Sequence, residues 1–185
     1  MAPTRAGEQT RAAQTLVLDP RIRRVGFAYF EAAILLDWGV RNVRNGEPKT
    51  RSARVIVPHL VRMLDEFEPA ILLVPAVGTG GTRRSVPVQE TVDAIVREAR
   101  GRGIVVNAVT DRDVTCTFRS VVAGRMTKHT IAQVIAKWFP ELGPRLPRPR
   151  RLWEPERHGT PMFNAVAMYC AWQGLPAKSQ GEAEP

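Results

Sequence analysis

Cysteine, lysine and long apolar runs are scarce in this 185-residue sequence. Its two cysteines, Cys116 and Cys170, are too far apart to match a metal-binding or redox motif. No run reaches the roughly 18 apolar residues of a membrane span, and residues 1–13 lack the apolar core of a secretory leader. These absences argue against a disulfide scaffold, a cysteine metal site and a membrane protein. We therefore expect a cytoplasmic protein with reduced thiols.

Lysine is also the minority among the basic residues. The chain has 27 Lys and Arg against 18 Asp and Glu, a formal net charge of +9, and its lysines are Lys49, Lys128, Lys137 and Lys178. The planar arginine side chain suits phosphate, so this excess favours a polyanionic partner such as DNA or RNA. The alternative explanation of the arginine excess is a GC-rich genome, whose codons favour arginine whether or not the protein binds a polyanion.

The order of apolar segments predicts one α/β domain over residues 14–173, between polar tails at 1–13 and 174–185 that we expect to be disordered. The first three segments are short and close together, which indicates an antiparallel three-stranded meander. Helical and strand-like patterns then alternate, which predicts a mixed sheet with helices on both faces. The expected strands are 16–19, 25–30, 34–43, 70–77 and 104–109, and the expected helices are 50–67, 88–101, 127–138 and 162–172.

Residues 16–28 read Leu-Val-Leu-Asp-Pro-Arg-Ile-Arg-Arg-Val-Gly-Phe-Ala. This segment and the element order resemble the RuvC family of Holliday junction resolvases, within the RNase H-like superfamily. In that family a catalytic aspartate stands at the position of Asp19, while Arg21 replaces a usual glycine. The resemblance implies an RNase H-like (RuvC-type) fold and a nucleic-acid partner.

The resemblance also implies a site for two divalent ions, and this sequence keeps few of its ligands. Asp19 matches the first aspartate of the family. The glutamate expected at the end of the 70–77 strand falls at Pro75, and the two aspartates of the last helix fall at Pro161 and Asn164. Because anionic ligands must offset the repulsion between two cations, we expect that the usual two-metal site does not form.

A second carboxylate could come from the segment after the 104–109 strand, which reads Thr-Asp-Arg-Asp. Residues 111–112 resemble the end of an Asp-Glu-Arg motif in the related YqgF-like proteins. Asp19, Asp111 and Asn164 could then act as catalytic residues around one Mg²⁺, with Asp19 and Asp111 as its ligands. The alternative is that Asp111 and Asp113 are turn residues that bond to nearby backbone.

Candidate contacts to nucleic acid lie in four basic segments: the turn after Asp19, the residues after the glycine-rich turn 78–82, the approach to the 127–138 helix, and the proline-rich connector 142–156. Backbone amides of the glycine-rich turn could also receive a phosphate. Each segment has a plainer alternative, as a flexible turn, a linker or a solvated face. The candidate residues are Arg21, Arg23, Arg24, Arg83, Arg84, Arg119, Lys128, Arg148, Arg150 and Arg151.

The sequence leaves three functions open. The first is a nucleic-acid-binding protein of RuvC-like fold that is inactive or weak as a nuclease and needs no cofactor. The second is a Mg²⁺-dependent, structure-selective endonuclease of the Holliday junction resolvase type, which hydrolyses phosphodiester bonds with Asp19 and Asp111. The third is a protein-interaction scaffold with a relic nuclease fold. A homodimer is compatible with all three.

Overall fold

The computed structural model describes residues 14–42, 52–77, 84–148 and 159–175. Arg83, Arg150, Arg151 and most of both predicted tails lie outside these ranges. None of the helices within them combines the length and apolar character that a membrane span requires. In chain order the elements are β1 (Gln14–Pro20), β2 (Arg24–Glu31), β3 (Ile34–Asn42), α2 (Ser52–Phe67), β4 (Ile71–Pro75), α3 (Val86–Gly101), β5 (Val105–Val109), α4 (Asp111–Phe118), α5 (Lys128–Trp138), the 3-10 helix η2 (Pro140–Arg145) and α6 (Thr160–Gln173).

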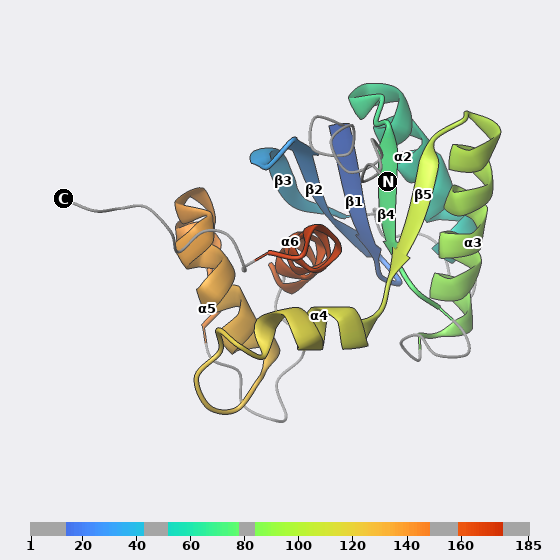
Figure 1. Cartoon of the computed structure of the whole chain (residues 1–185). Coiled ribbons are helices and arrows are strands. Elements are labelled where there is room, and N and C mark those ends of the chain that lie inside the picture. Colours follow the sequence, from blue (N-terminus) through green and yellow to red (C-terminus); the bar gives the residue numbers. More distant parts are fainter. Residues whose placement is uncertain (1–13, 43–51, 78–83, 149–158, 176–185) are drawn as a thin grey trace, which may run out of the picture.

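The five strands form one mixed sheet in the order β3-β2-β1-β4-β5 (Figure 1). Strand β2 is antiparallel to both β1 and β3, whereas β4 is parallel to β1 and β5 is parallel to β4. The predicted sheet is therefore confirmed, with Asp19 near the end of its central strand. Because β1, β4 and β5 run in the same direction, Asp19, Pro75 and Asp111 all lie toward one edge of the sheet, where open α/β folds bind ligands.

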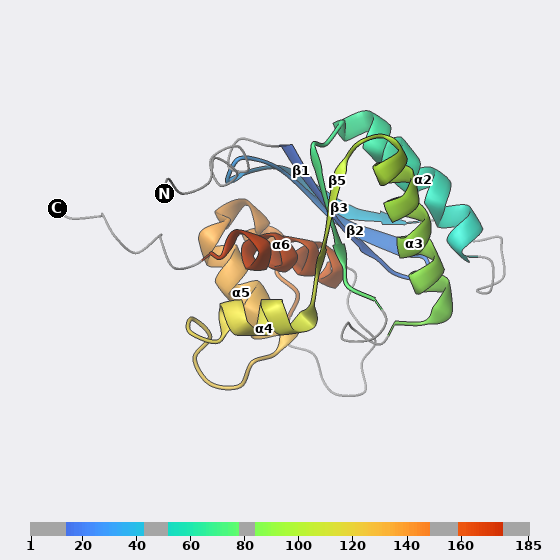
Figure 2. The same ribbon diagram turned by 45° about the vertical axis from the view of Figure 1, so that its right-hand side comes forward.

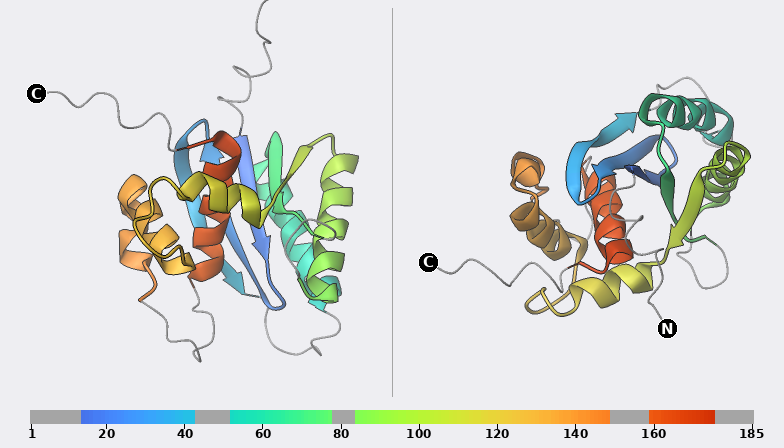
Figure 3. Two further views of the ribbon diagram at one scale, coloured as in Figure 1. Left: turned by 60° about the horizontal axis from the view of Figure 1, so that its bottom comes forward. Right: turned by 45° about the horizontal axis from the view of Figure 1, so that its top comes forward.

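Strand β1 contributes to two cores because successive side chains of a strand point to opposite faces. Leu16 and Leu18 pack with buried residues of α2 and α3. Val17 belongs to the core on the opposite face, together with buried residues of α5 and α6. Figures 2 and 3 show α2 and α3 covering one face, with α6 lying across the other and α5 outside it. The expected helices on both faces are confirmed.

Helix α6 is enclosed between the sheet and the outer helices. Every residue from 160 to 170 is buried except Asn164, which is half-buried. Gly26 of β2 allows this close approach, because a Cβ atom there would overlap the backbone carbonyl group of Pro161. Gly26 is also the cross-strand neighbour of Asp19. The start of α6 is thereby held beside the carboxylate.

Helix α4 was not predicted, and the alternative to a metal site at residues 110–113 was a turn. These residues are instead the N-cap and first turn of α4. The Thr110 side chain accepts a hydrogen bond from the backbone N–H of Asp113, whose carboxylate accepts one from the backbone N–H of Thr110. The hydroxyl and N–H of Thr110 hold the pKa of Asp113 below its usual value. Asp113 is thus a helix cap, and the Thr-x-x-Asp spacing was a readable signal. The proline-rich connector predicted to begin at residue 142 likewise starts within the 3-10 helix η2, where Leu142 is buried.

We predict that Gly26→Ala destabilises the protein, because the backbone of Pro161 can make room only if α6 shifts. The expected loss is about 3 kcal/mol or more in unfolding free energy, measured by urea titration with circular dichroism. Gly101→Ala is the control. A Cβ atom there meets nothing within 4 Å, and alanine is favoured over glycine in a helix by up to about 1 kcal/mol. Equal stability of Gly26→Ala and wild type would contradict this packing.

Candidate functional site

Asp19 lies at the centre of the candidate site. It is the penultimate residue of β1, and its side chain is 0% exposed. The paired residues of β1 and β4 end at Val17 and Leu73, so Asp19 lies beyond the paired part of these two strands. A carboxylate in such a buried position is unfavourable unless cations or hydrogen-bond donors compensate it.

Two arginines and one asparagine supply that compensation. The Nε and Nη2 atoms of Arg21 donate to Oδ2 of Asp19 over 3.0 and 2.8 Å. Nη1 of Arg84 donates to Oδ1 over 2.8 Å and to the carbonyl oxygen of Pro20 over 3.1 Å. Nδ2 of Asn164 completes the set, donating to Oδ2 over 3.1 Å. Both carboxylate oxygens therefore accept hydrogen bonds, and two guanidinium groups neutralise their charge.

The three donors come from separate parts of the chain. Arg21 belongs to the turn between β1 and β2, Arg84 comes shortly before α3, and Asn164 lies in the first turns of α6. The Arg84 side chain is only 8% exposed and that of Arg21 is 25% exposed. Two positive charges and one negative charge thus lie close together and largely out of water, which leaves the site with a positive excess.

The residues present do not fit the two-metal site that the fold family implies. Pro75 ends β4 and Pro161 lies in the first turn of α6, so neither expected position offers a ligand. Asn164 turns its NH2 group, not its carbonyl oxygen, toward Asp19. Within the described part of the chain, no three His, Cys, Asp or Glu side chains are grouped so that they could share an ion. A divalent ion at Asp19 would also have to displace two guanidinium groups.

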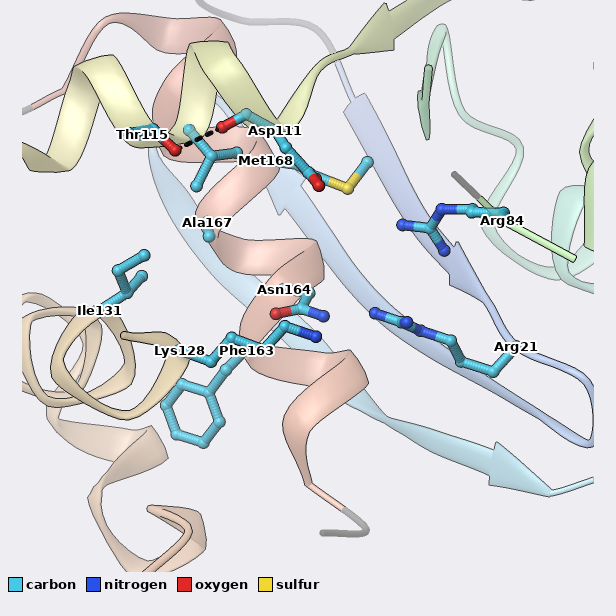
Figure 4. Close-up of a pocket in the computed structure, with 11 residues that line it drawn as sticks. Arg21, Arg84, Asp111, Thr115, Lys128, Ile131, Phe163, Asn164, Ala167 and Met168 are labelled. Carbon is cyan, nitrogen blue, oxygen red and sulfur yellow. Dashed lines mark hydrogen bonds between the residues drawn. The ribbon is translucent and has the colours of Figure 1, made fainter. Parts of the chain in front are cut away.

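A cavity of about 230 Å³ opens beside this cluster. Three cations line it, Arg21, Arg84 and Lys128, and the ends of their side chains point toward Asn164 (Figure 4). Asp111 also lines the cavity, so the structure brings this predicted carboxylate close to Asn164. The remaining wall is largely apolar and consists of Val114, Ile131, Phe163, Ala167 and Met168, with Thr115 as its polar member.

Among the predicted basic residues that the structure describes, the others do not line this cavity. Arg23, Arg119 and Arg148 are exposed and Arg24 is half-buried, so their assignment as nucleic-acid contacts stays a prediction. Arg83, Arg150 and Arg151 lie outside the described residues. Sequence reasoning missed that Arg84 binds Asp19, because no local pattern indicates a pairing across 65 positions. The contact of Arg21 with Asp19 was also missed, although only two positions separate these residues.

Neither the family models nor the curated proteins include a match to this sequence. Solved structures do. RuvC of Thermus thermophilus is similar with a TM-score of 0.56 at 19% identity, over 84% of this chain and 92% of that one. The same organism's RuvC in complex with a Holliday junction substrate gives 0.57 at 20% identity, over 85% and 91%. The yeast mitochondrial Holliday junction resolvase Ydc2 gives 0.59 at 10% identity, over 88% and 78%.

These likenesses show the fold. The chain has the α/β fold of the RuvC-like resolvases, with the same mixed five-stranded sheet. At this level of identity the shared fold does not carry the neighbours' chemistry, which depends on the residues of the site. In this chain the residues of the site include Arg21 and Arg84, which bind Asp19.

We predict that Asp19→Asn destabilises the protein by about 3 kcal/mol in unfolding free energy, because Arg84 would lose its buried counter-ion. Asp111→Asn is the control, since it removes an exposed carboxylate of the same cavity and costs at most about 1 kcal/mol from the helix dipole. Urea unfolding at neutral pH measures both. In a cluster of carboxylates built for metal, neutralising one acid relieves repulsion. A stabilised Asp19→Asn variant would therefore contradict the ion pairs described above.

Proposed function

We propose that this protein binds nucleic acid and does not hydrolyse it by the two-metal route. One observation carries the proposal: the carboxylate of Asp19, at the position of the family's catalytic aspartate, is bound by Arg21 and Arg84. The two guanidinium groups bind both oxygens of the carboxylate, which are the atoms that a divalent ion would need as ligands. The site therefore repels divalent cations and attracts anions.

The charge of the molecule supports a phosphate-bearing partner. The net charge is +9, and Arg21, Arg84 and Lys128 line one cavity at the edge of the sheet where β1 ends. Guanidinium groups form strong, charge-assisted hydrogen bonds with phosphate oxygens. The fold is shared with a RuvC whose structure contains a Holliday junction substrate, which makes branched DNA a natural first probe.

The endonuclease alternative has one observation in its favour, because Asp111 lines the same cavity as Asn164. It also has a physical obstacle. One exposed carboxylate would have to hold a metal beside three cationic side chains. We therefore propose nucleic-acid binding as the function. Cleavage would overturn the proposal that the protein does not hydrolyse nucleic acid.

We predict micromolar or tighter binding to a fluorescent junction or strand at about 50 mM salt, with affinity that falls steeply as salt rises. Lys128→Gln and Arg148→Gln should each weaken binding and lower the salt slope by about 1 if the residue contacts phosphate. Arg102→Gln is the matched control. It removes the same charge, but Arg102 is paired with Asp65 and Glu98 on the α2–α3 side of the sheet, so binding should not change.

The same mixtures, incubated with about 1 mM Mg²⁺ and resolved on a denaturing gel, test for cleavage. We expect intact strands. Absence of binding to any probe would overturn the binding proposal and favour the scaffold alternative. Multiple-turnover cleavage that is lost in Asp111→Asn would establish the endonuclease instead.

A further inference from the structure

The cavity beside Asp19 has two chemically different parts. Arg21, Arg84 and Lys128 give it three positive charges, against the negative charges of Asp111 in its lining and of the buried Asp19 that pairs with both arginines, which leaves one positive charge in excess. The ends of the three cationic side chains point toward Asn164 (Figure 4), and the apolar lining residues come from α4, α5 and α6. A ligand that matches both parts carries an anionic group joined to an apolar or flat one.

Arg84 is a second, independent indication of an anionic ligand. Its side chain is 8% exposed, and its Nε atom is buried without a hydrogen-bond partner in the described part of the chain. Buried donors in native proteins are nearly always paired, so an unpaired one requires an explanation. Asp19 already uses Nη1 of this guanidinium. A ligand oxygen that enters beside Arg84 could pair with Nε after a small shift of the side chain.

The size and shape of the cavity restrict the ligand further. At about 230 Å³ it is smaller than the roughly 300–1,000 Å³ pockets that enclose drug-sized molecules. It can enclose part of one nucleotide, but not a duplex, in which every base is stacked and paired. Ile131, Met168 and the part of Phe163 that lines the cavity form an apolar wall, and an unstacked base packs well against such a surface.

We propose that this cavity holds one unpaired nucleotide, with its phosphate among Arg21, Arg84 and Lys128 and its base against Phe163, Met168 and Ile131. This inference rests on the proposed nucleic-acid binding and adds a preference for single strands over duplex. A free nucleoside monophosphate offers the same chemistry as a nucleotide within a strand. The guanidinium groups at Asp19 would then serve as the phosphate anchor.

The test compares a labelled single strand of about ten nucleotides with the corresponding duplex, by fluorescence anisotropy. Ala167→Leu fills the cavity without changing any charge, and we expect it to weaken single-strand binding about tenfold, the value of one lost base contact, and to leave duplex binding unchanged. Lys128→Gln should also weaken single-strand binding. Lys137→Gln, at the other end of α5 and outside the cavity, is its matched control and should have no effect.

Competition identifies the source of the nucleotide. A nucleoside monophosphate should displace the single strand at concentrations where inorganic phosphate and the nucleoside alone do not, because only the monophosphate fills both parts of the cavity. The free monophosphate and an unlabelled strand are then compared as competitors of the labelled strand, with both concentrations counted per nucleotide. If the free monophosphate displaces the labelled strand at the lower concentration, the free nucleotide is the ligand. The reverse order identifies the strand.

A folded Ala167→Leu variant with unchanged single-strand affinity would overturn the inference, as would equal competition by phosphate and monophosphate. If Ala167→Leu does not fold, the Lys128 and Lys137 pair and the competition series decide. Duplex and junction binding without a preference for single strands would overturn this inference alone. Absence of binding to every probe would overturn the proposed function itself.

Discussion

The ion pairs of Asp19 with Arg21 and Arg84 are the interaction on which this edge of the sheet depends. A buried carboxylate is unfavourable unless it is compensated, and here the compensation comes from the turn after β1, from the approach to α3 and from α6. These three segments are therefore tied to the end of the central strand. Gly26 allows α6 to approach the sheet closely enough for Asn164 to reach Asp19, since any larger residue at position 26 would push Pro161 away.

The same ion pairs change what the shared fold can do. In a RuvC-like site, carboxylates at this edge hold divalent ions that stabilise the charge of a phosphodiester. Here prolines at 75 and 161 remove ligands, and two guanidinium groups supply positive charge directly from the protein. Guanidinium can bind a phosphate but cannot activate a metal-bound water. We therefore propose that the exchange keeps attraction for phosphate and removes the usual means of hydrolysis.

The sequence predicted the sheet well because its signals are local. Apolar runs of strand length and the Asp19 motif lie within a few residues, and they indicated the central strand, the meander and the two parallel strands. Helix α4 was missed because its eight residues bury only Phe118, although the Thr110–Asp113 capping box was readable. The pairing of Arg84 with Asp19 could not be predicted, because 27 basic residues compete for that role and only the folded chain selects among them. Asp111 was singled out through its motif, and it lines the cavity beside Asp19. Its role as a metal ligand stays a prediction.

Crystals grown with millimolar Mn²⁺ show most directly whether Asp19 binds a metal ion, because anomalous scattering locates manganese without ambiguity. We expect no anomalous peak at the carboxylate of Asp19, and we expect Arg21 and Arg84 within hydrogen-bond distance of its two oxygens. A manganese peak coordinated by Asp19, with the two guanidinium groups displaced, would contradict this expectation.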